Sequence, residues 1–351
     1  EIPEGEDVAA LFAGVDYQAI GYTTDAEKVV MKGFEKDLNE IITEWEAPLE
    51  GVFPVKPADN AADAEIKVEK VSYKERNTKA PALTIAKPRV IIPAFPGTNC
   101  EMDSKRAFER AGAQADIHII RNRTQEELIE SIKELEAKIR ESNIVMLPGG
   151  FSGGDEPDGS AKFITAIFRN PSIKEAVTDL LENRDGLMLG ICNGFQALIK
   201  LGLVPFGEII ETDETCPTLS YNTISRHQSK IVRVRLATEK SPWLTNVSAG
   251  DIFSVPISHG EGRILMDDKM VQDLAAKGQI LTQYVDEHGL PTNDIQFNPN
   301  GSTHAIEGLI SPDGRVLGKM GHAERIGDGL YQNVEGNYDM KLFKSMVEYF
   351  K

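Results

Sequence analysis

The hydrophobic positions along the chain change their period several times, and each period predicts a different kind of element. Between about 25 and 47, apolar residues recur at helical spacing and predict one amphipathic helix that ends at Pro48. From 54 to 88, the sequence is rich in Ala, Asp, Lys, Glu and Pro without sustained periodicity. This composition predicts a linker that follows the protein surface, with one short strand near 66–71.

Short apolar runs alternate with amphipathic stretches from Arg89 onward. The apolar runs predict strands at 90–92, 117–120, 144–147 and 187–191. The stretches between them predict helices at 101–111, 125–141 and about 159–182. Strands that alternate with helices in this way form a doubly wound α/β domain, whose mostly parallel sheet is covered by helices on both faces.

The pattern changes again after about 205, where apolar and polar residues alternate. This alternation predicts strands at 231–236, 252–257 and 280–285, and a hairpin from 305–310 to 315–320. A last helix is predicted at 339–350. We therefore expect two regions, an N-terminal helix with its linker over 1–87 and the α/β domain over 88–351.

Composition argues against several classes of partner. The 351-residue chain has a formal net charge of −17 at pH 7 and no cluster of Lys and Arg, so we expect no nucleic-acid partner. No apolar stretch approaches the roughly 20 residues that span a bilayer, so we expect no membrane partner. Three widely spaced cysteines favour a reducing cytoplasm over a disulfide framework. Because the chain starts at Glu1 without an initiator methionine, we expect a piece of a longer polypeptide.

The stretch around Cys192 carries the first sign of chemistry. A short apolar run ends directly before this cysteine, and a pattern of helical spacing begins directly after it. Gly190 and Gly194 flank the thiol at i−2 and i+2, the spacing of a nucleophile elbow, a sharp turn that exposes one strained side chain. A helix N-terminus also lowers the pKa of a cysteine below the roughly 8.5 of a free thiol. The alternative is a small apolar residue that fills the core.

Two histidines compete for the role of general base. His322 is followed at i+2 by Glu324 after a predicted strand, and His259 is followed by Glu261 in the same pattern. In an extended segment residues i and i+2 lie on the same side, so either carboxylate could orient its imidazole. The glycines that surround His259 favour a loop that approaches another backbone or a partner closely. Spacing alone does not separate the two histidines.

An acyl-transfer site also needs backbone N–H groups that stabilise an oxyanion. Gly149 and Gly150 follow a strand that should neighbour the elbow strand, so their loop should lie at the same edge of the sheet. We expect one donor from this loop and a second from the N–H of Asn193, the residue after the nucleophile.

The other two cysteines lack the elbow pattern. Cys100 precedes a predicted helix, for which Thr98 or Asn99 is the expected N-cap, but it has no glycines at i−2 and i+2. We interpret Cys100 as structural. Cys216 precedes a proline in an acidic stretch and is interpreted as a loop residue.

These motifs together resemble the triad glutamine amidotransferases, and within them the glutaminases of phosphoribosylformylglycinamidine synthases. The resemblance covers about 88–351 and rests on the stretches at 95–100, 148–152, 192–196 and 322–325. It implies the flavodoxin-like fold of class I glutamine amidotransferases. Residues 1–87 resemble the C-terminal helix and linker that lead out of the synthetase part in the long single-chain form of these enzymes.

Carried over to this sequence, the resemblance implies that Cys192 is the nucleophile, His322 the general base and acid, and Glu324 its orienting carboxylate. It places further residues at the oxyanion hole and the glutamine pocket: Gly149, Gly150, Phe151, Asn193, Gln196, Ser225, Arg226 and His227. This sequence departs from the family at His227, where Phe is usual, and at Ala323, where Pro is usual.

The implied reaction is hydrolysis of glutamine through a γ-glutamyl thioester on the cysteine. The ammonia would pass to a synthetase part, in cis, that uses ATP and Mg²⁺ to convert formylglycinamide ribonucleotide to the amidine. The resemblance implies that this chain itself holds no metal or nucleotide. Two alternatives are a thiol hydrolase of the same fold and a catalytically silent regulatory module. The wide separation of Cys192 and His322 argues against the first, and the intact triad argues against the second.

Overall fold

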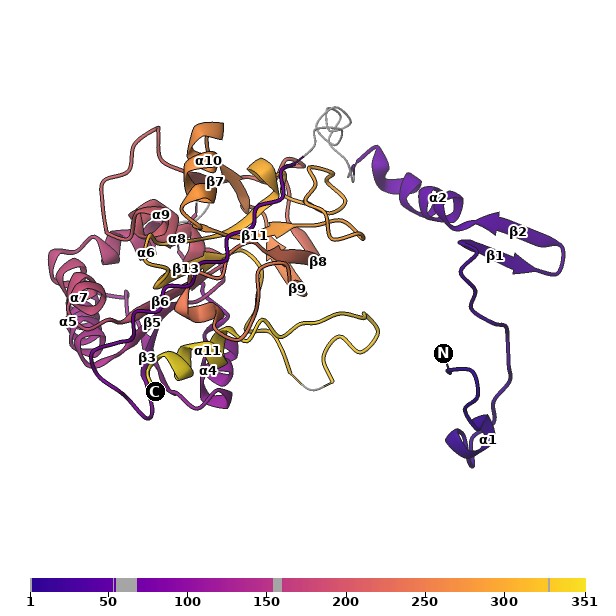
Figure 1. The fold of residues 1–351 in the computed structure, drawn as a ribbon, viewed down its shortest axis with the longest axis horizontal. Helices are drawn as coiled ribbons and strands as arrows, with labels where there is room; N and C mark the ends of the chain where they lie inside the picture. Colours follow the sequence, from indigo (N-terminus) through magenta and orange to yellow (C-terminus); the bar gives the residue numbers. More distant parts are fainter. Residues whose placement is uncertain (1, 53, 55–67, 154–159, 328) are drawn as a thin grey trace. The chain divides into compact units, whose positions relative to one another are not determined.

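The computed structural model describes residues 2–52, 54, 68–153, 160–327 and 329–351 (Figure 1). The chain forms two compact units, Glu1–Val55 and Lys56–Lys351. In the described part, no helix is both long enough and apolar enough to cross a membrane.

The N-terminal unit contains a short helix, a β-hairpin and a longer helix. These elements are α1 (Val8–Leu11), β1 (Lys28–Met31), β2 (Phe34–Asp37) and α2 (Leu38–Glu50). The two strands pair antiparallel in a sheet of their own. None of the described residues in these four elements is buried.

The single helix predicted over 25–47 is therefore wrong in its first half. The chain reverses at Gly33, whose φ of +79° suits a residue without a Cβ atom, and β-branched Val29 pairs with Lys36 across the turn. The carboxylate of Asp37 accepts a hydrogen bond from the N–H of Asn39 and begins the helix there. The helix also continues past the expected end at Pro48 to Glu50.

A nine-stranded mixed sheet organises the second unit, with the order β4-β3-β5-β6-β13-β12-β11-β8-β9. Its strands are β3 (Arg89–Ala94), β4 (Gln114–Ile119), β5 (Ile144–Leu147), β6 (Leu187–Ile191), β8 (Gln228–Leu236), β9 (Ile252–His259), β11 (Ile280–Tyr284), β12 (Ile306–Ile310) and β13 (Val316–Lys319). The first five strands in this order are parallel, and the remaining pairs are antiparallel. The parallel half has the 2-1-3-4-5 order of flavodoxin-like folds, which confirms the predicted α/β class.

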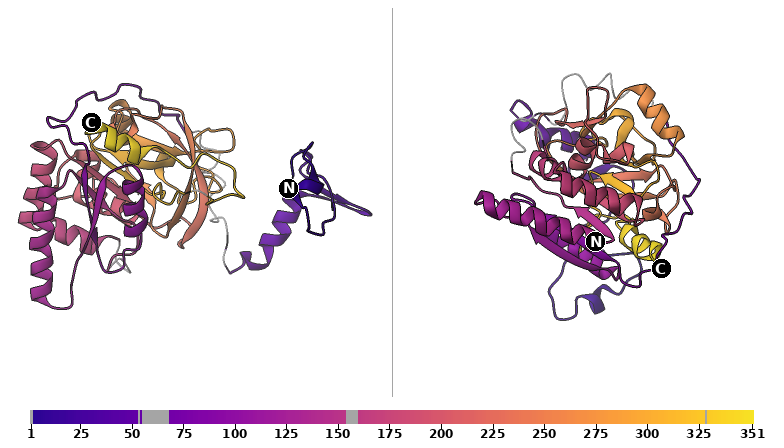
Figure 2. Two further views of the ribbon diagram at one scale, coloured as in Figure 1. Left: turned by 90° about the horizontal axis from the view of Figure 1, so that it is seen from below. Right: turned by 90° about the vertical axis from the view of Figure 1, so that its left-hand side faces the viewer.

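Helices cover both faces of the parallel half (Figures 1 and 2). One layer contains α5 (Gln125–Glu141), α6 (Lys162–Phe168), α7 (Pro171–Glu182) and α8 (Asn193–Leu201). The other contains α4 (Glu101–Arg110) and α11 (Leu342–Tyr349), whose rings Phe108 and Phe343 meet edge to face at 4.9 Å. These helices match the predicted βαβ rhythm.

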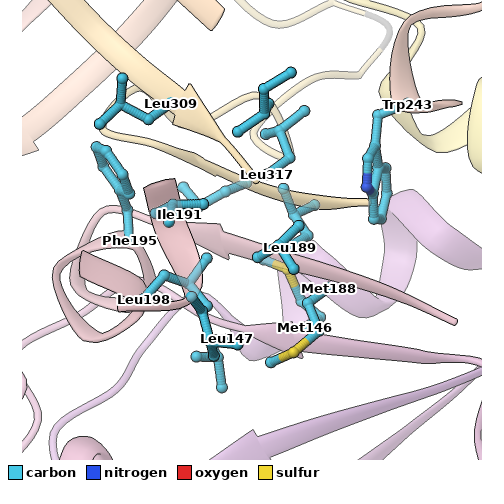
Figure 3. Packing of buried hydrophobic residues seen from close by; sticks show 14 of the residues in the cluster. Met146, Leu147, Met188, Leu189, Ile191, Phe195, Leu198, Trp243, Leu309 and Leu317 are labelled. Carbon is cyan, nitrogen blue, oxygen red and sulfur yellow. The ribbon is translucent and has the colours of Figure 1, made fainter. Parts of the chain in front are cut away.

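The core lies between these layers, and its centre is formed by the two strands that end at the site. Every residue of β5 and β6 is buried, as is typical of parallel strands that are covered on both faces. Met146, Leu189, Phe195 and Leu317 belong to one cluster of buried hydrophobic residues (Figure 3). Full burial of each such side chain contributes roughly 1.5 to 3 kcal/mol, so the strand ends that carry the site are rigidly held.

Several shorter elements complete the unit. They are α9 (Leu203–Phe206), β7 (Thr218–Ser220), the 3-10 turns η1 (Pro242–Leu244) and η2 (Thr303–Ala305), β10 (Arg263–Leu265) and α10 (Asp268–Ala276). Strands β7 and β10 form a separate antiparallel pair. The sequence pattern did not predict these elements, because most of them are too short to show a period.

The predicted linker follows the surface of this unit where it is described. The N–H of Tyr73 donates to the carbonyl of Ala237, and the N–H of Ile85 donates to the carbonyl of Phe350. Of the short strand predicted at 66–71, residues 66 and 67 lie outside the described residues, and 68–71 form no strand. The predicted boundary between 87 and 88 stays a prediction.

Candidate active site

Cys192 stands alone between β6 and α8, as the elbow spacing predicts. Its φ of +53° and ψ of −107° are strained for a residue with a Cβ atom. The thiol is only 4% exposed, whereas the elbow predicted an exposed side chain. Its Sγ lies 3.8 Å from the carbonyl oxygen of Ser258, at the end of β9. The antiparallel half of the sheet therefore covers the thiol.

The two flanking glycines are required by close backbone contacts. A Cβ atom on Gly190 would lie 2.6 Å from the carbonyl oxygen of Gly194. A Cβ atom on Gly194 would lie 2.0 Å from the carbonyl oxygen of Leu147, in the neighbouring strand β5. Both distances are shorter than any van der Waals contact, so only glycine at these positions lets α8 begin directly against the sheet.

His322 and Glu324 form a buried pair that follows β13. The Nδ1 atom of His322 lies 2.7 Å from Oε1 of Glu324, and both side chains are at most 1% exposed. The N–H of His322 donates to the carbonyl of Pro256 in β9, which fixes the backbone of the histidine. Among the described residues, Nε2 of His322 has no hydrogen-bond partner. This nitrogen remains available for proton transfer.

Each charged form of this pair stabilises the other. Burial lowers the pKa of His322, but the charge of Glu324 and the polar interactions of the ring with Cys100, Cys192 and Glu324 outweigh it and hold that pKa well above its usual range. Burial raises the pKa of Glu324, but the charge of His322 and its hydrogen bond outweigh it and lower that pKa. The pair is therefore an imidazolium and a carboxylate, the form that stabilises a neighbouring thiolate.

This arrangement predicts a pH-dependent contribution to stability. The raised pKa of His322 stabilises the fold below the unfolded value near 6.5, and this contribution is lost as pH rises through the folded value. The lowered pKa of Glu324 stabilises the fold above about 4.3, and this contribution is lost as pH falls. We compare urea unfolding of the wild type and of His322→Gln/Glu324→Gln, in which neither group titrates. The difference should be largest between about pH 4.3 and 6.5, and a difference independent of pH would contradict the assignment.

The loop after β5 brings the site together. A Cβ atom on Gly149 would lie 2.8 Å from Cε1 of His322, 3.2 Å from Sγ of Cys100 and 3.3 Å from Cβ of Cys192. The side chains of Cys192 and His322 therefore pack against the same glycine, and the loop lies at the same edge of the sheet as the elbow, as predicted. The N–H of Phe151, a residue assigned to the border of the oxyanion hole, donates to the carbonyl of Gly97.

His259 differs from His322 although both share a local pattern. It is 1% exposed, and neither ring nitrogen has a hydrogen-bond partner among the described residues. Burial, together with the charges of His322 and His227, lowers the pKa of His259 to about 3. Its ring is therefore neutral at physiological pH, and no carboxylate of the described residues is hydrogen-bonded to it. The geometry favours His322 as the general base.

A cavity of about 20 Å³ lies at the thiol. Its lining combines the elbow, the glycine loop and the end of β9: Gly150, Phe151, Ser160, Cys192, Gln196, His259, Gly260 and Glu261. The side chain of Asn193 accepts from the N–H of Ser152 and donates to Gln196, which itself donates to the carbonyl of Glu261. Gln196 thus lines the cavity, and Asn193 is hydrogen-bonded to it.

The stretch from Ser225 to His227 lies farther out. Ser225 and His227 are exposed, Arg226 is half-buried, and none of the three lines the cavity at Cys192. Nε2 of His227 lies 3.1 Å from Oγ of Ser258, and its ring centroid lies 6.1 Å from that of Phe151. His227 therefore stands at the rim of the site in this conformation.

Cys100 lies much closer to His322 than its interpretation as a structural residue implied. Its Sγ is 3.8 Å from Nδ1 of His322 and accepts a hydrogen bond of 3.1 Å from Nη2 of Arg325. Neither expected N-cap residue caps α4. Cys100 itself occupies the N-cap position, where its side chain makes no capping hydrogen bond to the helix, and Thr98 bonds back to Phe95. Cys216 lies in a loop, as predicted.

One cluster has the chemistry of metal ligands. The ligand atoms of Cys100, His322 and Glu324 lie within 4.8 Å of one another, and all three residues are buried. The guanidinium of Arg325 beside the Cys100 sulfur places a positive charge where a cation would bind. A hydrogen-bonded triad with a second thiol beside it describes this cluster better than a metal centre.

The sequence matches known families over most of its length. Residues 87–350 match the family described as the CobB/CobQ-like glutamine amidotransferase domain. The phosphoribosylformylglycinamidine synthase subunit PurQ of Methanococcus maripaludis strain C7 is 33% identical over 287 residues, which cover 75% of this chain and 97% of that protein. The same subunit of Pyrococcus furiosus is 32% identical over 260 residues, which cover 74% of this chain and 97% of that protein.

A solved structure shares the fold. A chain in the structure of PurLQS from Thermotoga maritima has a TM-score of 0.54 and 24% sequence identity, and the match covers 76% of this chain and 100% of that one. The family match extends over both the elbow and the His322 segment. The chain therefore belongs to the CobB/CobQ-like glutamine amidotransferase family.

Proposed function

We propose that this chain hydrolyses glutamine through a thioester on Cys192 and supplies ammonia for the conversion of formylglycinamide ribonucleotide to formylglycinamidine ribonucleotide. The observation that carries the proposal is the strained Cys192 elbow packed beside the buried His322–Glu324 pair. The substrate of the coupled reaction is inferred from relatives named as phosphoribosylformylglycinamidine synthase subunits.

The reaction divides into two acyl transfers. The Cys192 thiolate attacks the carboxamide carbon of glutamine, and backbone N–H groups of the Gly149 loop and of Asn193 stabilise the oxyanion. The His322 imidazolium then gives its proton to the leaving nitrogen, so ammonia departs and a γ-glutamyl thioester remains. In the second step neutral His322 takes a proton from water, and the resulting hydroxide attacks the thioester. The Cys192 thiolate leaves, the new carboxyl group gives its proton to solvent, and glutamate departs while the thiolate and the imidazolium are restored. Glu324 holds the imidazole in place throughout.

A synthetase partner completes this function. The relatives are named as subunits of a synthase, and the matched structure is a PurLQS assembly. We propose that the partner holds the ATP and Mg²⁺ that activate the ribonucleotide, and that this chain contributes ammonia only. The same proposal places the reaction in the cytoplasm.

The small size of this cavity predicts that the isolated chain is a slow glutaminase. Its volume of about 20 Å³ is far below the roughly 300 Å³ or more of a typical ligand pocket, so we expect the lining to move before glutamine binds. A partner that binds the open form more tightly shifts the population toward it. Glutamate release by this chain should therefore rise on the order of 10-fold or more when the synthetase, its ribonucleotide substrate and ATP are added.

The assay compares the chain alone, the chain with the synthetase, and the Cys192→Ala variant with the synthetase. The variant controls for contaminating glutaminase. Full activity of the chain alone would contradict the expected movement of the cavity lining. No glutamate release under any condition would overturn the proposed function itself.

A further inference from the structure

A buried ion pair lies directly behind His322. Nζ of Lys319 is 2.9 Å from Oε1 of Glu307, and both side chains are fully buried. Glu307 is in β12 and Lys319 is the last residue of β13, next to it in the sheet. The pair therefore joins two strands at the edge from which the His322 segment leaves.

Both members of the pair bind the residue before His322. Oε1 of Glu307 accepts a 2.6 Å hydrogen bond from the N–H of Gly321, and Nζ of Lys319 donates a 2.9 Å hydrogen bond to the carbonyl oxygen of Gly321. The two peptide groups that flank Gly321 are thus each fixed by one charge. The second of these peptides leads directly to the backbone nitrogen of His322.

Lys319 also connects to the nucleophile. Its backbone carbonyl accepts the 2.9 Å hydrogen bond of the Cys192 N–H, and it pairs in register with Ile191 of β6. The main chain of Lys319 therefore contacts the turn that contains Cys192. Its side chain contacts the turn that leads to His322. The relative position of the two turns depends on this connection.

Stability alone does not explain a pair buried in this way. Taking two charges out of water is costly, and apolar replacements of buried pairs are often neutral or stabilising. The remaining Glu307 oxygen accepts a hydrogen bond from the Thr282 hydroxyl in β11, so the carboxylate is held from three directions. Because every oxygen of this carboxylate is hydrogen-bonded, the network fixes one backbone geometry at Gly321 and excludes others.

We infer that Glu307 and Lys319 are positioning residues, which hold the His322 imidazole at the distance and angle from Cys192 that proton transfer requires. The inference rests on the proposed glutaminase function. Proton transfer depends steeply on geometry, and a displacement of about 1 Å costs on the order of 100-fold in rate. Substrate binding does not depend on Gly321 in the same way, because this residue does not line the cavity at the thiol.

The test replaces both charges together. Lys319→Met alone leaves the Glu307 carboxylate buried without its partner and is expected to destabilise the fold. The variant to be tested is therefore Glu307→Gln/Lys319→Met. Its glutamine side chain can still accept from the Gly321 N–H, while the bond to the Gly321 carbonyl is lost. Arg235→Met is the matched control, because it removes another buried cation of the same sheet, whose guanidinium binds the carbonyl of Val71.

Steady-state glutamine hydrolysis is measured with the synthetase present, beside thermal unfolding of each variant. We expect kcat of the double variant to fall on the order of 10- to 100-fold with KM for glutamine changed less than about threefold. The control should keep kcat and KM whatever its change in Tm. Unchanged kcat in a folded double variant, or a loss that appears mainly in KM, would overturn the inference. An inactive wild type would instead overturn the proposed function.

Discussion

Cys192→Ala is expected to abolish glutamine hydrolysis while the protein remains folded. Loss of a nucleophile that acts with its base as a unit costs at least about 10⁴-fold in rate. Alanine keeps the Cβ atom, so the strain of the positive φ at this position is unchanged and only the buried sulfur is lost. The expected cost in stability is about 1 kcal/mol. Glutamate formation and thermal unfolding of the two proteins check both parts.

A diazoketone that mimics glutamine should label Cys192 alone. The competing site is Cys100, because its sulfur lies near His322 and Arg325. Cys100 lacks the elbow conformation and is fully buried, so a reagent that enters the glutamine pocket should reach Cys192 first. Peptide mass mapping of the wild type and of Cys100→Ser identifies the labelled residue. Labelling that persists in Cys192→Ala and is lost in Cys100→Ser would reverse the assignment.

The features that the sequence predicted well depend on neighbouring residues. The elbow requires two glycines within two positions of Cys192, and the parallel strands require continuous apolar runs, which are visible in any short window. The His322–Glu324 contact is also local, because it joins residues two positions apart. A short sequence pattern of this kind is sufficient to predict the local geometry of its residues.

The errors arise where one local pattern suits two structures. Val29 and Val30 fit the apolar stripe of a helix, but they are β-branched, and the Gly33 turn allows them to pair as a strand. Spacing alone therefore extended the helix too far toward the N-terminus. The presence of a glycine within the predicted helix was the signal that could have corrected it.

Other features depend on contacts that no sequence window contains. The sulfur of Cys100 meets Arg325 only because β3 and β13 end at the same edge of the sheet. Glu307 and Lys319 each resemble an ordinary strand residue with a charged side chain, and only the register of β12 and β13 joins them in the core. Burial also distinguishes His259 from His322, because their local sequences share the same pattern of histidine and glutamate.

His322→Ala is expected to lower the rate of glutamine hydrolysis on the order of 100-fold or more, which is the usual scale for loss of a general acid and base. The variant loses both the charge beside the thiol and the proton donor for the leaving ammonia. Glu324→Gln should have a smaller effect in the same direction, because the imidazole remains but the charge that raises its pKa is lost. The kcat values of both variants, measured with the synthetase present, check this order.

His259→Ala provides the matched control, since it removes another buried histidine, which lines the cavity at Cys192. Its ring is neutral and makes no hydrogen bond to a described residue, so it cannot serve as the cation beside the thiolate. We expect this variant to keep most of the intrinsic glutaminase rate and to disturb mainly the response to the synthetase, because His259 lines the cavity that must open. Equal losses of intrinsic rate in both alanine variants, or a loss in His259→Ala alone, would show that the base has been assigned to the wrong histidine.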